Sequence, residues 1–176
     1  MSNNASKSAS VNEHRKQASE KDPVLISFVT VSDSRTPETD ENIQYFRENI
    51  DKQNQRLSDY YIVRDEPTEI ESVLEKLIKT PAQVIIFNGG TGISKRDRTF
   101  DVLSGKLEKT LPGFGEIFRM LSYQEVGSAA MLSRATAGVY KNKLIISIPG
   151  SPNAVQLAWE KLLKKELKHL AWEILR

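Results

Sequence analysis

Cysteine is absent from the 176-residue chain, and histidine occurs only twice, at His14 and His169. The absence of cysteine excludes a disulfide framework, a thiolate nucleophile and a cysteine-based zinc or iron–sulfur site. His14 falls in a polar leader and His169 in an expected C-terminal helix, so neither lies in a loop typical of a catalytic site. Chemistry must therefore use carboxylates, Lys, Arg, hydroxyls, backbone N–H groups and a hard cation, a set suited to phosphoryl or nucleotidyl transfer.

Long hydrophobic runs and an excess of one charge are also lacking. No apolar run approaches the roughly 20 residues needed to cross a bilayer, and the N-terminus carries no apolar stretch of a secretory signal. The 25 Lys and Arg nearly balance the 23 Asp and Glu, giving a net charge of +2, which argues against a general nucleic-acid binder. We expect a cytoplasmic protein with neither a membrane nor a nucleic-acid partner.

What is present is the pattern of one α/β domain behind a leader. Residues 1–21 are rich in Ser, Asn, Lys and Ala without an apolar period, and they are predicted to be disordered. Across residues 22–176, short apolar blocks alternate with stretches of helical periodicity. This alternation is typical of a three-layer α/β/α sandwich with a mostly parallel sheet. In such sheets, ligands bind beyond the carboxyl ends of the strands.

The apolar patterns place the elements of this domain. The expected strands are 24–31, 59–63, 84–87, 135–140 and 143–148, the last two as a hairpin or as adjacent strands. The expected helices begin at Thr36–Pro37, at a capping box of Thr68 and Glu71, near Phe100, near Glu116 and near Asn153, and the last is long and closes the chain.

The strongest candidate site is the glycine loop that follows the third expected strand. Gly89, Gly90, Thr91 and Gly92 expose backbone N–H groups and permit the close approach of a phosphate. The loop is not a Walker A motif, because Lys95 stands where the second glycine is required, and it also fails the Rossmann fingerprint. It therefore indicates anion binding without indicating a familiar nucleotide-binding fold.

The loops after the first two strands have a functional and a structural interpretation. In the first loop, the hydroxyls of Thr30 and Ser32 and the side chain of Arg35 hold an anion, or else Ser32 and Asp33 only form an ordinary strand-end turn. Asp65 is either a metal-facing or general-base carboxylate, or part of a solvated acidic turn before a helix.

Three later segments carry the same ambiguity. Asp97, between two arginines, is a site carboxylate or part of a surface charge cluster. The segment 149–152 starts a helix, with Ser151 as N-cap and Pro152 at the first position, and also leaves N–H groups for an anion. The segments 112–116 and 133–134 are either site residues or a turn and a polar surface pair.

Taken together, six motifs resemble the MoaB/Mog family of molybdenum-cofactor biosynthesis proteins. The resemblance covers the chain from about Val24 to the final helix, and the segment 118–139 is more similar to the MoaB branch than to the Mog branch. The motifs are TVSDSR at 30–35, NGGTG at 88–92, RDRT at 96–99, PGFGE at 112–116, LSRA at 132–135 and PGSP at 149–152.

The resemblance implies a three-layer α/β/α fold, a trimer or hexamer, and a reaction. The reaction is the Mg²⁺-dependent adenylylation of molybdopterin by ATP, giving adenylyl-molybdopterin and pyrophosphate. By motif position, Asp65 and Asp97 correspond to the family's catalytic carboxylates, and both would hold Mg²⁺. Phe100 departs from the pattern, since the family often has proline there. Some MoaB-branch members do not serve as the adenylyltransferase, so a non-catalytic molybdopterin-binding or scaffold protein is the alternative, and a general nucleotide-processing domain is a third.

With ATP as co-substrate, Mg²⁺ as the metal and no tightly bound cofactor, the expected binding residues come from all these loops. They are Thr30, Ser32, Asp33, Arg35, Gly89, Gly90, Thr91, Gly92, Thr99, Pro112, Gly113, Gly115, Glu116, Ser133, Arg134, Pro149, Gly150, Ser151 and Pro152.

Overall fold

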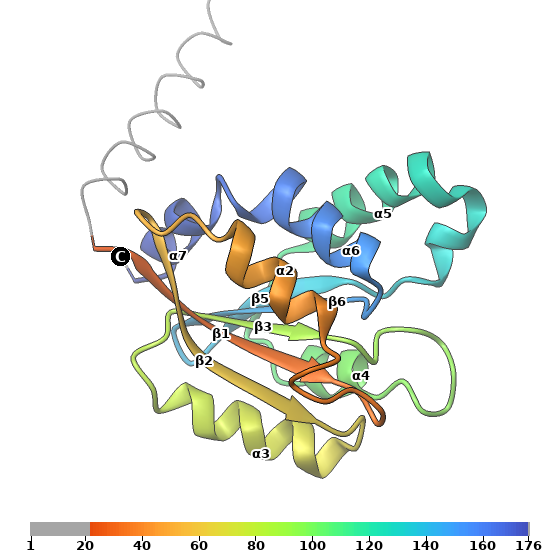
Figure 1. Cartoon of the computed structure of the whole chain (residues 1–176), viewed down its shortest axis with the longest axis horizontal. Helices are drawn as coiled ribbons and strands as arrows, with labels where there is room; N and C mark the ends of the chain where they lie inside the picture. Colours follow the sequence, from red (N-terminus) through yellow and green to blue (C-terminus); the bar gives the residue numbers. More distant parts are fainter. Residues whose placement is uncertain (1–21, 176) are drawn as a thin grey trace, which may run out of the picture.

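A six-stranded sheet separates two layers of helices in the computed structural model, which describes residues 22–175 (Figure 1). The strand order is β2-β1-β3-β6-β5-β4. The first four strands in that order run parallel, and β5 and β4 complete one edge as antiparallel strands. The strands are β1 (Val24–Val31), β2 (Gln55–Val63), β3 (Val84–Asn88), β4 (Lys109–Thr110), β5 (Thr136–Tyr140) and β6 (Lys143–Ile148). The expected α/β/α sandwich is confirmed, whereas the leader and His14 lie outside the described residues.

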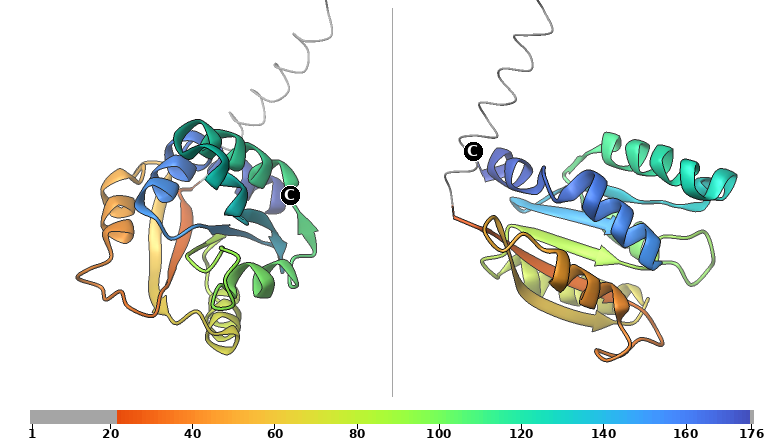
Figure 2. Two further views of the ribbon diagram at one scale, coloured as in Figure 1. Left: turned by 90° about the vertical axis from the view of Figure 1, so that its right-hand side faces the viewer. Right: turned by 45° about the horizontal axis from the view of Figure 1, so that its top comes forward.

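The two helix layers are unequal (Figure 2). One face of the sheet is covered by α2 (Glu41–Asn49), α5 (Pro112–Val126), α6 (Pro152–Leu157) and α7 (Leu167–Leu175), and the other by α3 (Pro67–Ile78) and α4 (Thr99–Ser104). Because both faces are covered, β3 is buried along its whole length and β1 along nearly all of it. Such strands are apolar without alternation, as the sequence pattern indicated.

The larger core layer is centred on an aromatic cluster. Phe46 of α2 packs on Phe28 of β1 and, edge-on, against Trp159, with ring centroids 5.0 Å and 4.6 Å apart. Trp159 is 1% exposed, and its indole Nε1 donates to the Asn49 carbonyl at 3.1 Å. Trp159 is therefore a core residue that ties the C-terminal helices to the end of α2.

The single long closing helix expected from the sequence is wrong. A π-helical segment (Ala158–Leu163) follows α6, and a turn at 164–166 separates it from α7. Within the π-helical segment, the Lys164 amide donates to the Trp159 carbonyl, five residues back, at 2.9 Å. The wider turn allows both Trp159 and Leu163 to face the core.

Two expected helix starts are also wrong. The first helix begins at Glu41, because the buried carboxylate of Asp40 accepts hydrogen bonds from the amides of Asn42 and Ile43, whereas Thr36 belongs to a separate turn. The capping box at Thr68 does not form, because α3 begins at Pro67 and Thr68 therefore lies within the helix and not at its N-cap. In both places, residues that are typical of a helix N-terminus lie within a few positions of the residue at which the helix begins.

The strand boundaries differ in two places. β2 begins four residues earlier than expected, at Gln55, and its pairing with β1 contains a bulge between Ile26 and Ser27. The two-residue strand β4 was not expected. The hairpin of β5 and β6 is confirmed, and Lys141 and Asn142 turn it with φ angles of 47° and 60°. No helix within residues 22–175 has the length and apolar character needed to cross a membrane.

Candidate functional site

Four loops meet at the carboxyl ends of the parallel strands β1, β2, β3 and β6, and they enclose a pocket of about 370 Å³. We call this the strand-end pocket. It is lined by Val31, Ser32, Asp33, Arg35, Asp65, Gly89, Gly90, Arg96, Asp97 and Gly150. The structure thus brings together residues from each of the four loops that the sequence analysis singled out after strands.

The glycine loop packs directly on the carboxylates. Gly90 has a φ of +63°, and a β-carbon there would collide with the side chains of Asp65 and Thr99. A β-carbon at Gly92 would lie 2.8 Å from a carboxylate oxygen of Asp97. Glycine is therefore required at position 90 by both backbone conformation and space, and the loop backbone lies within reach of any anion held beside these carboxylates.

Asp65 is a buried carboxylate at the floor of the pocket, 8% exposed. Its Oδ1 accepts hydrogen bonds from the Arg98 amide at 3.0 Å and the Thr99 hydroxyl at 3.3 Å. Burial raises the pKa of Asp65 above its ordinary value, and the negative charge of Asp97 adds to that rise, while the hydrogen bonds oppose it.

Asp97 faces the same pocket from the far end of the glycine loop. Its Oδ2 accepts from the Ser94 amide at 2.8 Å, which closes a tight turn over residues 94–97. Within residues 22–175 no cluster of three or more His, Asp or Glu is placed to hold a metal. Of the three aspartates that line the pocket, Asp33 pairs with Arg96, which leaves Asp65 and Asp97 as the carboxylates nearest the glycine loop. A cation bound between them would relieve their mutual repulsion.

The raised pKa of Asp65 leads to a prediction about stability. The folded chain holds the Asp65 proton more tightly than the unfolded chain, so stability is lost as pH rises from the unfolded value of about 3.9 through the folded pKa. Asp65→Asn removes the free-energy cost of keeping this buried carboxylate ionised. We expect the Tm of the variant at pH 7 to exceed that of the parent chain by roughly 2–4 °C.

The measurement is thermal unfolding of both proteins at pH 3 and pH 7. The gain should disappear at pH 3, where Asp65 is protonated in either state. Asp51→Asn is the matched control, because a hydrogen bond from Asn54 lowers the pKa of Asp51, and it should give no gain at pH 7. An equal gain in Tm at both pH values would contradict the raised pKa of Asp65.

Arg35 crosses the pocket wall to reach a buried carboxylate. Its guanidinium donates to the Gly150 carbonyl at 2.9 Å and pairs with Asp40 at 3.4 Å. Asp40 is fully buried and also accepts from the hydroxyls of Thr30 and Tyr60, at 2.5 Å and 2.7 Å. Burial, with the Asp40 hydrogen bond, raises the pKa of Tyr60. Thr30 therefore lies behind the pocket wall and supports Arg35 through Asp40.

Two asparagines that the sequence analysis did not select connect the loops. The Asn42 amide donates to the Asn88 side chain at 2.7 Å and to the Gly150 carbonyl at 2.8 Å. Asn88 in turn donates to the Pro149 carbonyl at 2.7 Å. Asn88 stood in the NGGTG motif, whereas Asn42 lies inside a helix and carried no sequence signal.

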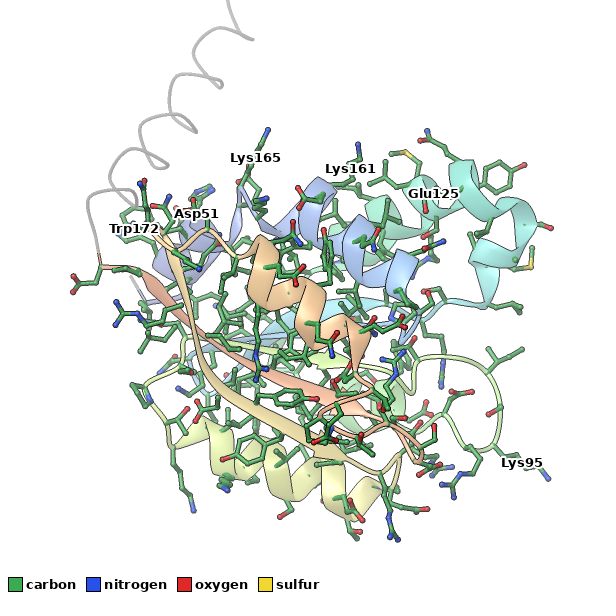
Figure 3. The ribbon with its side chains drawn as sticks, in the orientation of Figure 1. Asp51, Lys95, Glu125, Lys161, Lys165 and Trp172 are labelled. Carbon is green, nitrogen blue, oxygen red and sulfur yellow. The ribbon has the colours of Figure 1, made fainter. Side chains whose placement is uncertain are left out.

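An ion-pair cluster lies at the mouth of the strand-end pocket. Arg96 pairs with Asp33 at 2.5 Å and with Glu66 at 2.8 Å. The hydrogen bond from Arg96 holds the pKa of Asp33 below its usual value. The neighbouring Lys95 points away from the body of the protein at the tip of the loop (Figure 3). The glycine loop is thus joined across the pocket mouth to the β1 and β2 loops.

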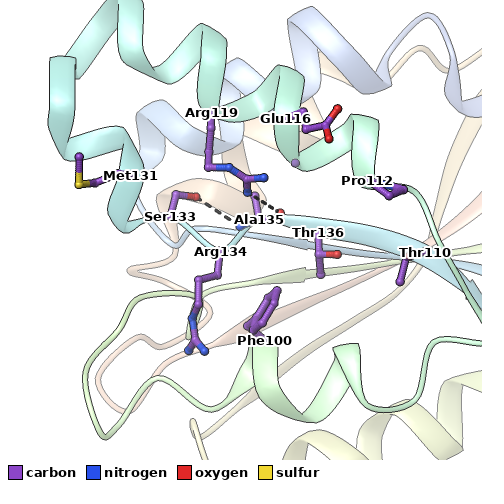
Figure 4. Close-up of a pocket in the computed structure, with 11 residues that line it drawn as sticks. Phe100, Thr110, Pro112, Glu116, Arg119, Met131, Ser133, Arg134, Ala135 and Thr136 are labelled. Carbon is purple, nitrogen blue, oxygen red and sulfur yellow. Dashed lines mark hydrogen bonds between the residues drawn. The ribbon is translucent and has the colours of Figure 1, made fainter.

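A second pocket of about 460 Å³ lies beside α5, and Figure 4 shows its lining; we call it the α5 pocket. It collects five of the expected residues: Pro112, Gly115, Glu116, Ser133 and Arg134. It also includes Phe100 and Arg119, which were not selected, although Arg119 lies one helical turn after Gly115. The Arg119 guanidinium donates to the Ala135 carbonyl at 3.3 Å.

The remaining expected residues do not line either pocket. Thr91 and Thr99 are buried, and Gly92 packs against the Asp97 carboxylate. Gly113 has open space around it, Pro149 accepts a hydrogen bond from Asn88, and Ser151 and Pro152 form the start of α6. Ser151 is the N-cap, as expected, and its hydroxyl accepts from the Ala154 amide at 3.3 Å. These side chains position the loops, while the backbone of the glycine loop and Gly150 forms the pocket surface.

Comparison with known proteins agrees with this geometry. Residues 27–169 match the family described as a probable molybdopterin binding domain. Molybdenum cofactor biosynthesis protein B of Bacillus cereus is 44% identical over 169 residues, covering 95% of this chain and 99% of the relative. The Staphylococcus aureus (strain COL) protein of the same name is 47% identical over 154 residues, covering 86% and 92%.

Solved structures give the same result. A crystal structure of molybdenum cofactor biosynthesis protein B matches with a TM-score of 0.83 and 42% identity over 88% of this chain and 97% of that chain. The tungsten cofactor synthesizing protein MoaB from Pyrococcus furiosus matches with a TM-score of 0.79 and 34% identity, covering 89% and 99%. With the family match, these similarities show that the chain belongs to the MoaB/Mog family of molybdenum cofactor biosynthesis proteins.

Proposed function

We propose that this chain acts in molybdenum cofactor biosynthesis as a Mg²⁺-dependent molybdopterin adenylyltransferase. The terminal phosphate of molybdopterin would attack the α-phosphorus of ATP, forming a new P–O bond, and the bond between the α-phosphorus and its bridging oxygen would break to release pyrophosphate. The observation that carries the proposal is the convergence of Asp65, Asp97, Gly89 and Gly90 on one pocket. Ionised phosphate is already a nucleophile, so a chain without cysteine needs no thiol for this step.

The residues present fit a magnesium ion. Mg²⁺ prefers carboxylate oxygens and usually keeps several waters, binding through one or two carboxylates and the phosphates of its substrate. Asp65 and Asp97 supply such a pair of carboxylates, and both line the strand-end pocket. When bound, Mg²⁺ would neutralise charge on the triphosphate and polarise the attacked phosphorus.

The other residues of the strand-end pocket would bind and orient the polyanion. The guanidinium groups of Arg35 and Arg96 line the pocket and would donate to phosphate oxygens beside the backbone of Gly90, whereas the Gly89 amide already donates to the Ile148 carbonyl. Arg96 would have to exchange Asp33 or Glu66 for a phosphate, which is a change of partner and not a loss of one. The α5 pocket would then hold a ring of one substrate, with Phe100 as an apolar face.

Release of pyrophosphate tests the proposal. Purified protein with ATP and Mg²⁺ should release pyrophosphate only when molybdopterin is added, and chelation of Mg²⁺ should stop the release. Tight molybdopterin binding without pyrophosphate would favour the non-catalytic alternative, and release without molybdopterin would favour a general nucleotide-processing domain.

We also propose that the protein is a homo-oligomer that associates through α5 and the 3-10 segment after it (Gly127–Leu132). Large apolar side chains gather there, each at least 46% exposed: Ile117, Met120, Tyr123, Val126, Met131 and Leu132. Contiguous exposed apolar surface of this kind is typical of association sites.

The corresponding prediction concerns mass in solution. The double change Met120→Glu and Tyr123→Glu should convert the oligomer to a monomer in light scattering, because it would bury two unpaired charges in the contact. Leu175→Glu, at an equally exposed apolar residue of α7, is the matched control and should keep the parent mass. A parent chain that is itself monomeric would refute this proposal.

A further inference from the structure

Arg134 lies between the two pockets, in the short connection that leads into β5. Its side chain is 25% exposed and lines the α5 pocket. In Figure 4 its guanidinium points away from α5, on the side of Phe100, whose ring centroid lies 4.7 Å from the guanidinium carbon. Arg134 is among the binding residues expected from the sequence, but the contacts of its guanidinium point to another role.

All three guanidinium nitrogens of Arg134 have partners in the loop or in α4. Nε donates to the Thr91 carbonyl at 3.3 Å, Nη2 to the Asp97 carbonyl at 3.0 Å, and Nη1 to the Asp101 carboxylate at 2.7 Å. The Arg134 backbone amide also donates to the Thr91 carbonyl, at 3.2 Å. The side chain therefore joins the two ends of the exposed segment between Thr91 and Asp97.

Besides Arg134, the exposed segment is attached by the side chain of Arg96, which pairs with Asp33 and Glu66, and by the Arg98 amide, which donates to Asp65. Its internal hydrogen bonds, between Ser94 and Asp97, fix the turn at its tip but do not attach the turn to the sheet. The Asp97 carbonyl is held by Arg134, and the Asp97 carboxylate faces the strand-end pocket on the other side of the same residue. The place of that carboxylate relative to Asp65 thus depends on where Arg134 holds the backbone.

We propose that Arg134 is a positioning residue that fixes the 91–97 loop so that the Asp97 carboxylate stays opposite Asp65. The planar, forked guanidinium suits this role, because it reaches two carbonyls and a carboxylate at once, which the single ammonium of lysine does not. The part of this inference that concerns metal binding rests on the proposed function, whereas the holding of the loop does not.

Hydrogen exchange tests the holding of the loop directly. The amides of Ser94 and Arg98 donate to Asp97 and Asp65, so they report on both carboxylates. Arg134→Ala should accelerate exchange at these two amides by about tenfold or more, as expected for loss of charge-assisted hydrogen bonds, while the amides of β1 and β3 keep their rates. Arg47→Ala, which removes an arginine stacked on Tyr60 outside both pockets, is the control and should leave the loop amides unchanged.

A metal titration separates positioning from substrate binding. In both Arg134→Ala and Arg134→Lys, the Mg²⁺ concentration for half-maximal rate should rise about tenfold with little change in the KM for molybdopterin, and millimolar guanidinium ion should partly restore the alanine variant. Unchanged loop exchange, equal acceleration in β1 and β3, or a raised KM with normal Mg²⁺ dependence would each overturn the proposal. If the protein releases no pyrophosphate at all, the proposed function fails, and the exchange result still decides the role of Arg134.

Discussion

Asp97→Asn will reduce the rate of pyrophosphate release by about 10²-fold or more. The substitution keeps the shape of the side chain and an oxygen that can accept from the Ser94 amide, so the turn over residues 94–97 should persist. What is lost is the negative charge that Asp97 presents to the strand-end pocket beside Asp65. The measurement is the rate of pyrophosphate release at saturating ATP and molybdopterin, repeated over a range of Mg²⁺ concentrations.

The effect should be specific to this carboxylate. Glu71→Gln is the control, because Glu71 is an exposed acid of α3 that pairs with Lys106 away from the pocket, and its rate should match the parent. If excess Mg²⁺ restores the Asp97→Asn rate, Asp97 acts in binding the metal. If the variant turns over normally at every Mg²⁺ concentration, Asp97 has no part in the reaction.

Asp40→Ala should lower the free energy of unfolding by about 4 kcal/mol, the order measured when one member of a buried charged pair is removed. The carboxylate is fully buried and accepts from Thr30, Tyr60 and the first amides of α2, besides pairing with Arg35. Its removal leaves those buried donors without their acceptor. Urea unfolding followed by circular dichroism measures the loss.

A conservative variant divides this effect into its parts. Asp40→Asn can still cap α2 through Oδ1. Its amide NH2 replaces the Oδ2 that accepts from the hydroxyls of Thr30 and Tyr60, so it should lose those hydrogen bonds and the charge that pairs with Arg35, about 2 kcal/mol. The neighbouring Glu41→Gln, at an exposed position of the same helix, should unfold as the parent does. Equal losses in Asp40→Asn and Asp40→Ala would mean that the charge and the Oδ2 hydrogen bonds, and not the helix cap, account for the stabilisation.

The layers of the fold could be predicted because buried strands and amphipathic helices have different apolar periods. The apolar pattern was least informative where tertiary contacts determine the bounds of an element. The first half of β2 is polar and lies at an edge, and β4 is too short to carry any period. The start of α2 depends on Asp40, whose capping role requires the long-range partners Thr30 and Tyr60. Local cap signals cannot reveal such partners.

The gathering of Asp65 and Asp97 could be predicted because both follow parallel strands, whose carboxyl ends meet at one side of the sheet. Which loop residues line the pocket and which support it from behind could not be predicted. Thr30 belongs to a strand whose side chains alternate between faces, and only the register shows that its hydroxyl supports Asp40 behind the pocket. Asn42 and Arg119 are single polar residues in helices, and they acquire a role only once distant loops are packed against them.

The outer strands of the sheet have a consequence for solubility. On one side β4 pairs over only Lys109 and Thr110, and on the other the bulge beside Ile26 interrupts the regular ladder between β1 and β2. A short edge and an irregular one are poor templates for adding a strand from another molecule. Copies that meet would do so through side chains, so their assembly should stay reversible and should not grow into fibrils.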